Sequence, residues 1–111
     1  MPVELNLAKF YSRRQKMEDD ATKMANDILK DCPDGFSQEG GPLLRTVATF
    51  QLKNFCKARA EQLAFAVGAM MFSSGFWVQD TVTQRKDNCK LVFKIQRMTE
   101  QEYREHVLEE D

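Results

Sequence analysis

The chain has 111 residues, with 16 basic and 17 acidic side chains and 42% hydrophobic residues, which predicts one small domain over residues 1–111. Its net charge of −1 is unlike the basic balance of dedicated nucleic-acid-binding domains. The uncharged segment 63–78 is too short to cross a membrane as a straight helix. The start, MPVELNLAKF, lacks the features of a secretory signal, so we expect a cytoplasmic protein.

The first predicted element is a long helix over residues 6–31, with Asn6 as a candidate N-cap and Pro33 as a stop. Its apolar residues recur at alternating three- and four-residue spacings, as in the seam of a heptad repeat. This seam can pack on another helix of the same chain or on a second subunit. It comprises Leu7, Phe10, Arg14, Met17, Ala21, Met24 and Ile28.

A turn over residues 32–42 precedes a second predicted helix over residues 43–74. Small side chains spaced by four, at Cys56, Ala60, Ala64 and Gly68, predict close approach of another helix. A helix of this length would extend about 48 Å, beyond the roughly 34 Å span of a compact chain of this size. It therefore either kinks or is covered by a second copy of the chain, and we expect a homo-oligomer.

Residues 76–85 and 90–98 alternate between apolar and polar side chains and predict a β-hairpin. Turning at Asp87-Asn88 would pair Val82 with Phe93 on the face that packs against the helices. An even-length loop is favoured, because an odd shift would mix the two faces.

Thr99 and Glu102 form a capping-box pattern that opens a short C-terminal helix. The predicted fold is therefore α+β and mainly α, in the order α-α-β-β-α. It consists of two long antiparallel helices, a β-hairpin packed on them and a short C-terminal helix.

The sequence contains no legible catalytic, cofactor or metal motif. Cys32, Cys56 and Cys89 are odd in number and form no C-x-x-C pair, which argues against a disulfide framework or zinc knuckle. His106 lies in a charged segment and is interpreted as a surface residue. Asp80 is expected to form an ion pair with Arg97 at the edge of the core. We expect neither an enzyme nor a cofactor.

The leading functional hypothesis is a non-catalytic intracellular interaction protein, a small oligomeric assembly or inhibitor-type module that binds another protein. A phage accessory protein fits this description. The expected contact residues are Leu7, Met17, Met24, Ile28, Ala60, Ala64 and Gly68.

Two alternatives remain open. The hairpin over residues 77–98 has a basic surface and could bind nucleic acid, where cations contact phosphate and an aromatic ring stacks on a base. Its candidate anion or nucleic-acid contacts are Trp77, Arg85, Lys86, Lys90 and Lys94. The second alternative is a small enzyme whose site lies at a subunit interface.

Overall fold

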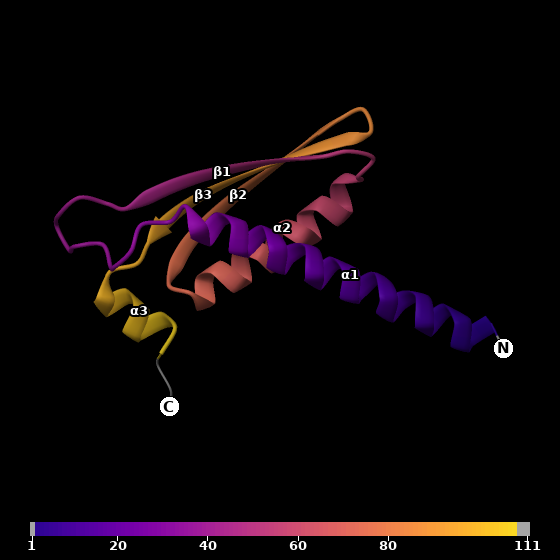
Figure 1. Cartoon of the computed structure of the whole chain (residues 1–111), viewed down its shortest axis with the longest axis horizontal. Coiled ribbons are helices and arrows are strands. Elements are labelled where there is room, and N and C mark those ends of the chain that lie inside the picture. Colours follow the sequence, from indigo (N-terminus) through magenta and orange to yellow (C-terminus); the bar gives the residue numbers. More distant parts are fainter. Residues whose placement is uncertain (1, 109–111) are drawn as a thin grey trace.

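The computed structural model describes the backbone of residues 2–108 and the side chains of residues 12–108. Within that backbone, three helices and three strands follow one another in the order α-β-α-β-β-α. Figure 1 shows the strands as one sheet with α1 and α2 along it. The elements are α1 (Pro2–Lys30), β1 (Arg45–Leu52), α2 (Lys57–Ser73), β2 (Phe76–Arg85), β3 (Asn88–Arg97) and α3 (Glu100–His106).

The predicted fold of two long helices and a β-hairpin is wrong, because residues 43–74 form two elements. The first part is β1 and only the second part is the helix α2. Side chains of β1 alternate between exposed and half-buried, which is the two-residue period of a strand. The β-branched Thr46, Val47 and Thr49 favour that conformation. Asn54 then adopts a φ of 54°, a left-handed conformation that separates the strand from α2.

The sheet has the order β1-β3-β2, and β3 is antiparallel to both neighbours. β1 and β2 therefore run in the same direction and are connected through α2, with β3 inserted between them. Because β3 lies in the centre, its backbone is paired on both sides. The prediction found this strand but missed β1, its second partner.

The predicted hairpin is confirmed as β2 and β3, with an even, two-residue loop at Lys86-Asp87. This loop lies one residue before the predicted turn, and Lys86 has a φ of 57°. Val82 consequently pairs with Leu91 rather than with Phe93. The register differs from the prediction by two residues, so each side chain keeps its predicted face.

The hydrophobic core lies between one face of the sheet and the helices α1 and α2. Every second side chain of β3 from Cys89 to Ile95 is buried, as expected for a strand with one covered face. α2 contributes residues spaced by three and four, and α1 contributes its C-terminal half. The buried side chains from these helices are Ala21, Met24, Ala25, Ile28, Ala60, Leu63, Ala64, Val67 and Met71.

The two longer helices run in the same general direction, not antiparallel as predicted (Figure 1). Met17 of α1 lies beside Phe65 of α2, and one turn later Thr22 donates a hydrogen bond to the Met70 sulfur at 3.9 Å. This direction follows from β1, which returns the chain before α2 begins. The helix that extends past the body is α1, whose 29 residues span about 43 Å.

Asn6 lies inside α1, which begins at Pro2, so its predicted role as an N-cap is wrong. The capping box is confirmed: Thr99 Oγ1 accepts from the Glu102 N–H at 3.1 Å, and Glu102 Oε1 accepts from the Thr99 N–H at 2.9 Å. Among the described residues, no helix has the length and apolar character needed to cross a membrane.

Arg97 connects the end of β3 to two loops. Its guanidinium lies 4.6 Å from the Phe36 ring centroid and 4.7 Å from that of Phe76. It donates to the carbonyl oxygens of Gly35 at 2.9 Å and Ser74 at 2.6 Å. The predicted ion pair between Arg97 and Asp80 does not form, because these contacts occupy the guanidinium. Asp80 lies opposite Phe93 in the strand register, away from Arg97.

Candidate functional site

The face of the sheet opposite α1 and α2 has none of the described helices packed across it. Its side chains come from alternate positions of the three strands and form cross-strand rows. One row joins Val47, Lys94 and Gln79, and another joins Gln51, Lys90 and Thr83. No acidic residue occurs at these outward positions, which are Arg45, Val47, Thr49, Gln51, Trp77, Gln79, Thr81, Thr83, Arg85, Asn88, Lys90, Val92, Lys94 and Gln96. We call this surface the uncovered face.

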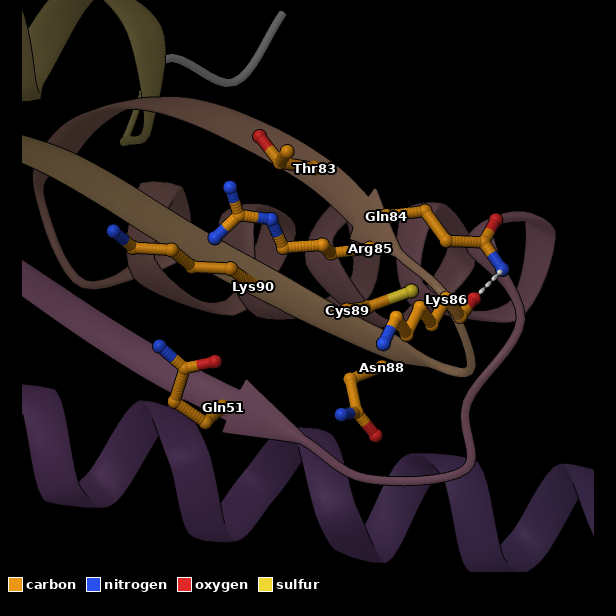
Figure 2. A pocket seen from close by; sticks show the side chains of 8 residues that line it. All are labelled: Gln51, Thr83, Gln84, Arg85, Lys86, Asn88, Cys89 and Lys90. Atoms are coloured by element: carbon orange, nitrogen blue, oxygen red, sulfur yellow. Dashed lines mark hydrogen bonds between the residues drawn. The ribbon is translucent and has the colours of Figure 1, made fainter.

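A shallow hollow lies at the hairpin end of the uncovered face (Figure 2). Three of its side chains are cationic, Arg85, Lys86 and Lys90, and none is acidic. Figure 2 shows Arg85 and Lys90 extending over the strands, with α2 behind them. Gln84 fixes the turn, because its Nε2 donates to the Lys86 carbonyl oxygen at 3.2 Å. The remaining lining residues are Gln51, Thr83, Gln84, Asn88 and Cys89.

A second hollow lies at the opposite end of the same sheet. Arg45 and Lys94 supply its positive charges, Trp77 its aromatic ring and Val47 an apolar side chain that is 65% exposed. Its other lining residues are Thr46, Val78, Gln79, Ile95 and Gln96, so this hollow too contains no acidic side chain. The two hollows together place five cations along the sheet.

Contacts on both sides hold the Trp77 ring in place. Its centroid lies 5.7 Å from that of Phe72 in α2 and 5.1 Å from that of His106 in α3, both edge to face. Trp77 is half-buried and still lines the second hollow. The indole is therefore held in position before any ligand binds.

The five cations of the two hollows have no carboxylate partner among the described side chains. The ion pairs found within 4.0 Å all lie inside helices and join Arg14 to Glu18, Lys30 to Asp27, Lys57 to Glu61, and Arg104 to Glu100. Like charges that converge without compensation produce a local positive potential. The uncovered face is thus cationic although the whole chain is slightly acidic.

Acidic side chains border one end of this face. Glu102 and Glu105 of α3 share a separate shallow depression with Gln96. The Thr99 backbone N–H, which donates to the Glu102 carboxylate, holds the pKa of that carboxyl below its ordinary range. Glu102 therefore stays ionised beside the Trp77 end, while Asp27 and Asp31 line a further depression with Val47 and Thr49 at the β1 edge.

The five predicted anion contacts lie together on this sheet but in two groups. Arg85, Lys86 and Lys90 line the hairpin hollow, whereas Trp77 and Lys94 line the second one. Arg45 was missed, because β1 was assigned to a helix. The alternation of polar and apolar side chains at Thr49, Phe50, Gln51 and Leu52 was the sequence signal that could have found the strand.

The predicted helix contacts lie mostly in the core. Met24, Ile28, Ala60 and Ala64 are buried, and Met17 is half-buried. The intramolecular interpretation of the seam therefore holds for this part of α1.

Two members of the predicted contact set differ from the rest. The Leu7 side chain lies outside the described side chains, as does that of Phe10. A Cβ built on Gly68 would meet no atom within 4 Å. Ala60 and Ala64 of the small-residue ridge are thus fully buried within the chain, whereas no described residue packs closely on Gly68, and a contact there with a second copy stays a prediction.

The fold lowers the reactivity of two of the three cysteine thiols. Burial raises the pKa of the Cys32 thiol, and its interaction with Thr46 lowers that pKa by a smaller amount. A raised pKa reduces the fraction of the thiol that is present as the nucleophilic thiolate. Cys89 is buried and donates to the Phe55 carbonyl oxygen at 3.1 Å. Among the described residues, no group of three or more His, Cys, Asp or Glu side chains is placed to hold a metal ion.

Comparisons with protein-family models, with curated proteins and with solved structures found no match for this chain.

Proposed function

We propose that this chain is a non-catalytic interaction protein that binds an anionic macromolecule through the uncovered face. The observation that carries the proposal is the pair of hollows on one face, whose lining includes five cations and no acid. Binding a polyanion there would neutralise charges that the fold itself leaves unpaired. The three free cysteines are consistent with action in the reducing cytoplasm.

The burial pattern supports an interaction role. Lys90 and Lys94 are exposed on the central strand, whereas Leu91 and Phe93 between them are fully buried. A rigid sheet thereby presents the cations at fixed spacing, which lowers the entropy lost on binding. Open, shallow hollows suit a macromolecular surface better than a small substrate, which requires enclosure.

Chromatography on immobilised heparin, a polyanion, tests the proposal. We expect the chain to be retained at low salt despite its sequence pI of about 5.9, and the double variant K90E/K94E to elute much earlier. The matched control is K16E/K23E, which makes the same charge change at two exposed positions of α1. Passage of the unmodified chain through the column without retention, or an equal loss of retention in both double variants, would contradict a local binding face.

We also propose that the chain self-associates, because of one exposed aromatic side chain. Phe65 of α2 is 79% exposed and lines a shallow hollow with Met17, Ala58 and Ala66. Met17 places this hollow beside α1, and α1 extends beyond α2 (Figure 1). A second copy covering the hollow would bury the phenyl ring and gain apolar contact area.

Light scattering at micromolar concentration tests self-association. We expect an oligomer for the unmodified chain, a monomer for Phe65→Glu, and an oligomer for Gln38→Glu, a charge-matched change at an exposed loop position. A 12.9 kDa monomer of the unmodified chain would overturn this second proposal without affecting the first.

A further inference from the structure

We infer that the anionic partner of the uncovered face is a single-stranded nucleic acid. This inference rests on the proposed function and adds the class of partner. Phosphates would follow the cations across the sheet, and a base would pack against Trp77 and Val47 in the second hollow.

The cations form a diagonal track across the three strands. The track begins at Arg45 on β1, which pairs with Gln96. It continues through Lys94 and Lys90 on β3 and ends at Arg85 on β2, which pairs with Asn88. From the row of Gln96 to that of Asn88 is eight residues of β3, which is about 26 Å at roughly 3.3 Å per residue. Such a length accommodates several nucleotides, as in other small sheets that bind single strands.

The side chains between the cations fit a nucleic acid better than an acidic protein segment. Thr49, Thr81, Thr83 and Gln79 supply hydroxyl and amide groups along the track, and these can hydrogen-bond to sugars, phosphates and base edges. A prepositioned indole beside two cations offers a stacking surface for a base. An acidic peptide would form ion pairs with the cations but would have no base to stack on the indole.

The shape of the face favours a single strand over a duplex. Reading a duplex requires a helix or a two-stranded ribbon that enters the major groove. Here the cations and Trp77 lie across the broad side of a three-stranded sheet, in two shallow hollows. An unpaired strand can lie along such a surface and turn its bases toward it.

Fluorescence anisotropy with the full chain and labelled 15-nucleotide oligothymidine and oligouridine tests the inference. We expect binding that weakens with salt. Four phosphate contacts predict a logarithmic slope near −2.8 for a single strand, or roughly a 50-fold loss between 50 and 200 mM salt. K90E/K94E should abolish binding, whereas K16E/K23E should bind within about twofold of the unmodified chain.

Trp77 is the only tryptophan of the chain, so its fluorescence reports on the site directly. Base stacking should quench it on titration with oligothymidine, and Trp77→Leu should weaken binding roughly fivefold or more. Circular dichroism of each variant checks that the fold is retained, and Lys94→Gln and Lys90→Gln provide milder substitutions.

The outcomes separate this inference from the proposed function. Retention on heparin without binding to either oligonucleotide would overturn the inference alone. Equal or tighter binding of a duplex of the same length, or competition by polyglutamate as effective as that by oligothymidine, would also overturn it. Absence of binding to heparin and to the oligonucleotides would overturn both.

Discussion

The two faces of the sheet differ in chemistry although they are made from the same strands. On β3, Leu91 and Phe93 are fully buried under the helices, whereas Lys90 and Lys94 point to the opposite side and are exposed. On β1, Phe50 packs edge to face against Phe93 with centroids 6.0 Å apart. The covered face therefore supplies most of the stability of the fold. Residues of the uncovered face are not needed for the core and are available for binding.

This division explains why a chain with balanced charge can present a cationic surface. The ion pairs of the described side chains lie within helices, and exposed pairs of this kind contribute little to stability. On the uncovered face Lys90 and Arg85 lack such partners. Substitutions there should change binding strongly and folding weakly, while substitutions on the covered face should do the reverse.

The largest expected effect on stability is at Phe93, in the centre of the covered face. Phe93→Ala removes a fully buried ring and leaves a cavity, which should reduce the free energy of unfolding by about 3–5 kcal/mol. The adjacent Val92→Ala, on the uncovered face, should cost less than about 1 kcal/mol. Urea denaturation followed by circular dichroism measures both. Similar losses for the two variants would break the distinction between the faces.

Two cations of β3 provide the next test. Arg97→Lys loses stacking on two phenyl rings and the fixed geometry of its bonds to loop carbonyls, so we expect a loss of about 1.5–3 kcal/mol. Lys94→Arg on the uncovered face should be nearly neutral for stability. Thermal melts compare them, and a neutral Arg97→Lys would show that this guanidinium does not hold the loops.

How far the sequence could predict the fold depends on how local each signal was. The Thr99 capping box and the alternation in residues 76–85 were found because their signals lie within a few residues. β1 was missed because Leu44, Val47, Ala48 and Leu52 also match helical spacing, and its strand pairing is with β3, about forty residues later along the chain. Long-range pairing of this kind overrides a local pattern.

The candidate site was predicted in part for the same reason. Lys86 and Lys90 were identifiable within the hairpin, but Arg45 joins them only when β1 pairs with β3. The sequence also contained no indication that Trp77 would be held between Phe72 and His106. Such contacts depend on how α2 and α3 meet the edge of the sheet.

The third test concerns α2, which covers the inner face. Ala64 is fully buried, so Ala64→Leu should overpack the core and cost about 1–3 kcal/mol. Gly68→Ala should instead stabilise the chain by up to about 1 kcal/mol, because a Cβ there has open space and alanine favours a helix. Urea denaturation measures the free energy of unfolding of both variants. Destabilisation by Gly68→Ala would indicate that another segment packs closely on Gly68, as first predicted.

The smallest expected effect is at Glu102, at the border between α3 and the uncovered face. The lowered pKa of this carboxyl, caused first by the Thr99 backbone N–H, means that the folded state favours the ionised form. Its contribution is present above the ordinary glutamate pKa of the unfolded chain and is lost as the pH falls through the lower folded-state pKa. Because the half-buried carboxylate is still reached by solvent, which screens its charge, Glu102→Gln should cost no more than about 0.5 kcal/mol at pH 7.

The pH dependence of that difference is the decisive measurement. Melts of the unmodified chain and of Glu102→Gln between pH 7 and pH 3 should converge as the carboxyl protonates, because the protonated acid and the amide are both neutral. Glutamine can still accept the Thr99 bond, so the helix should remain capped. A difference that stays constant or grows toward pH 3 would show that ionisation of Glu102 does not stabilise this end of the sheet.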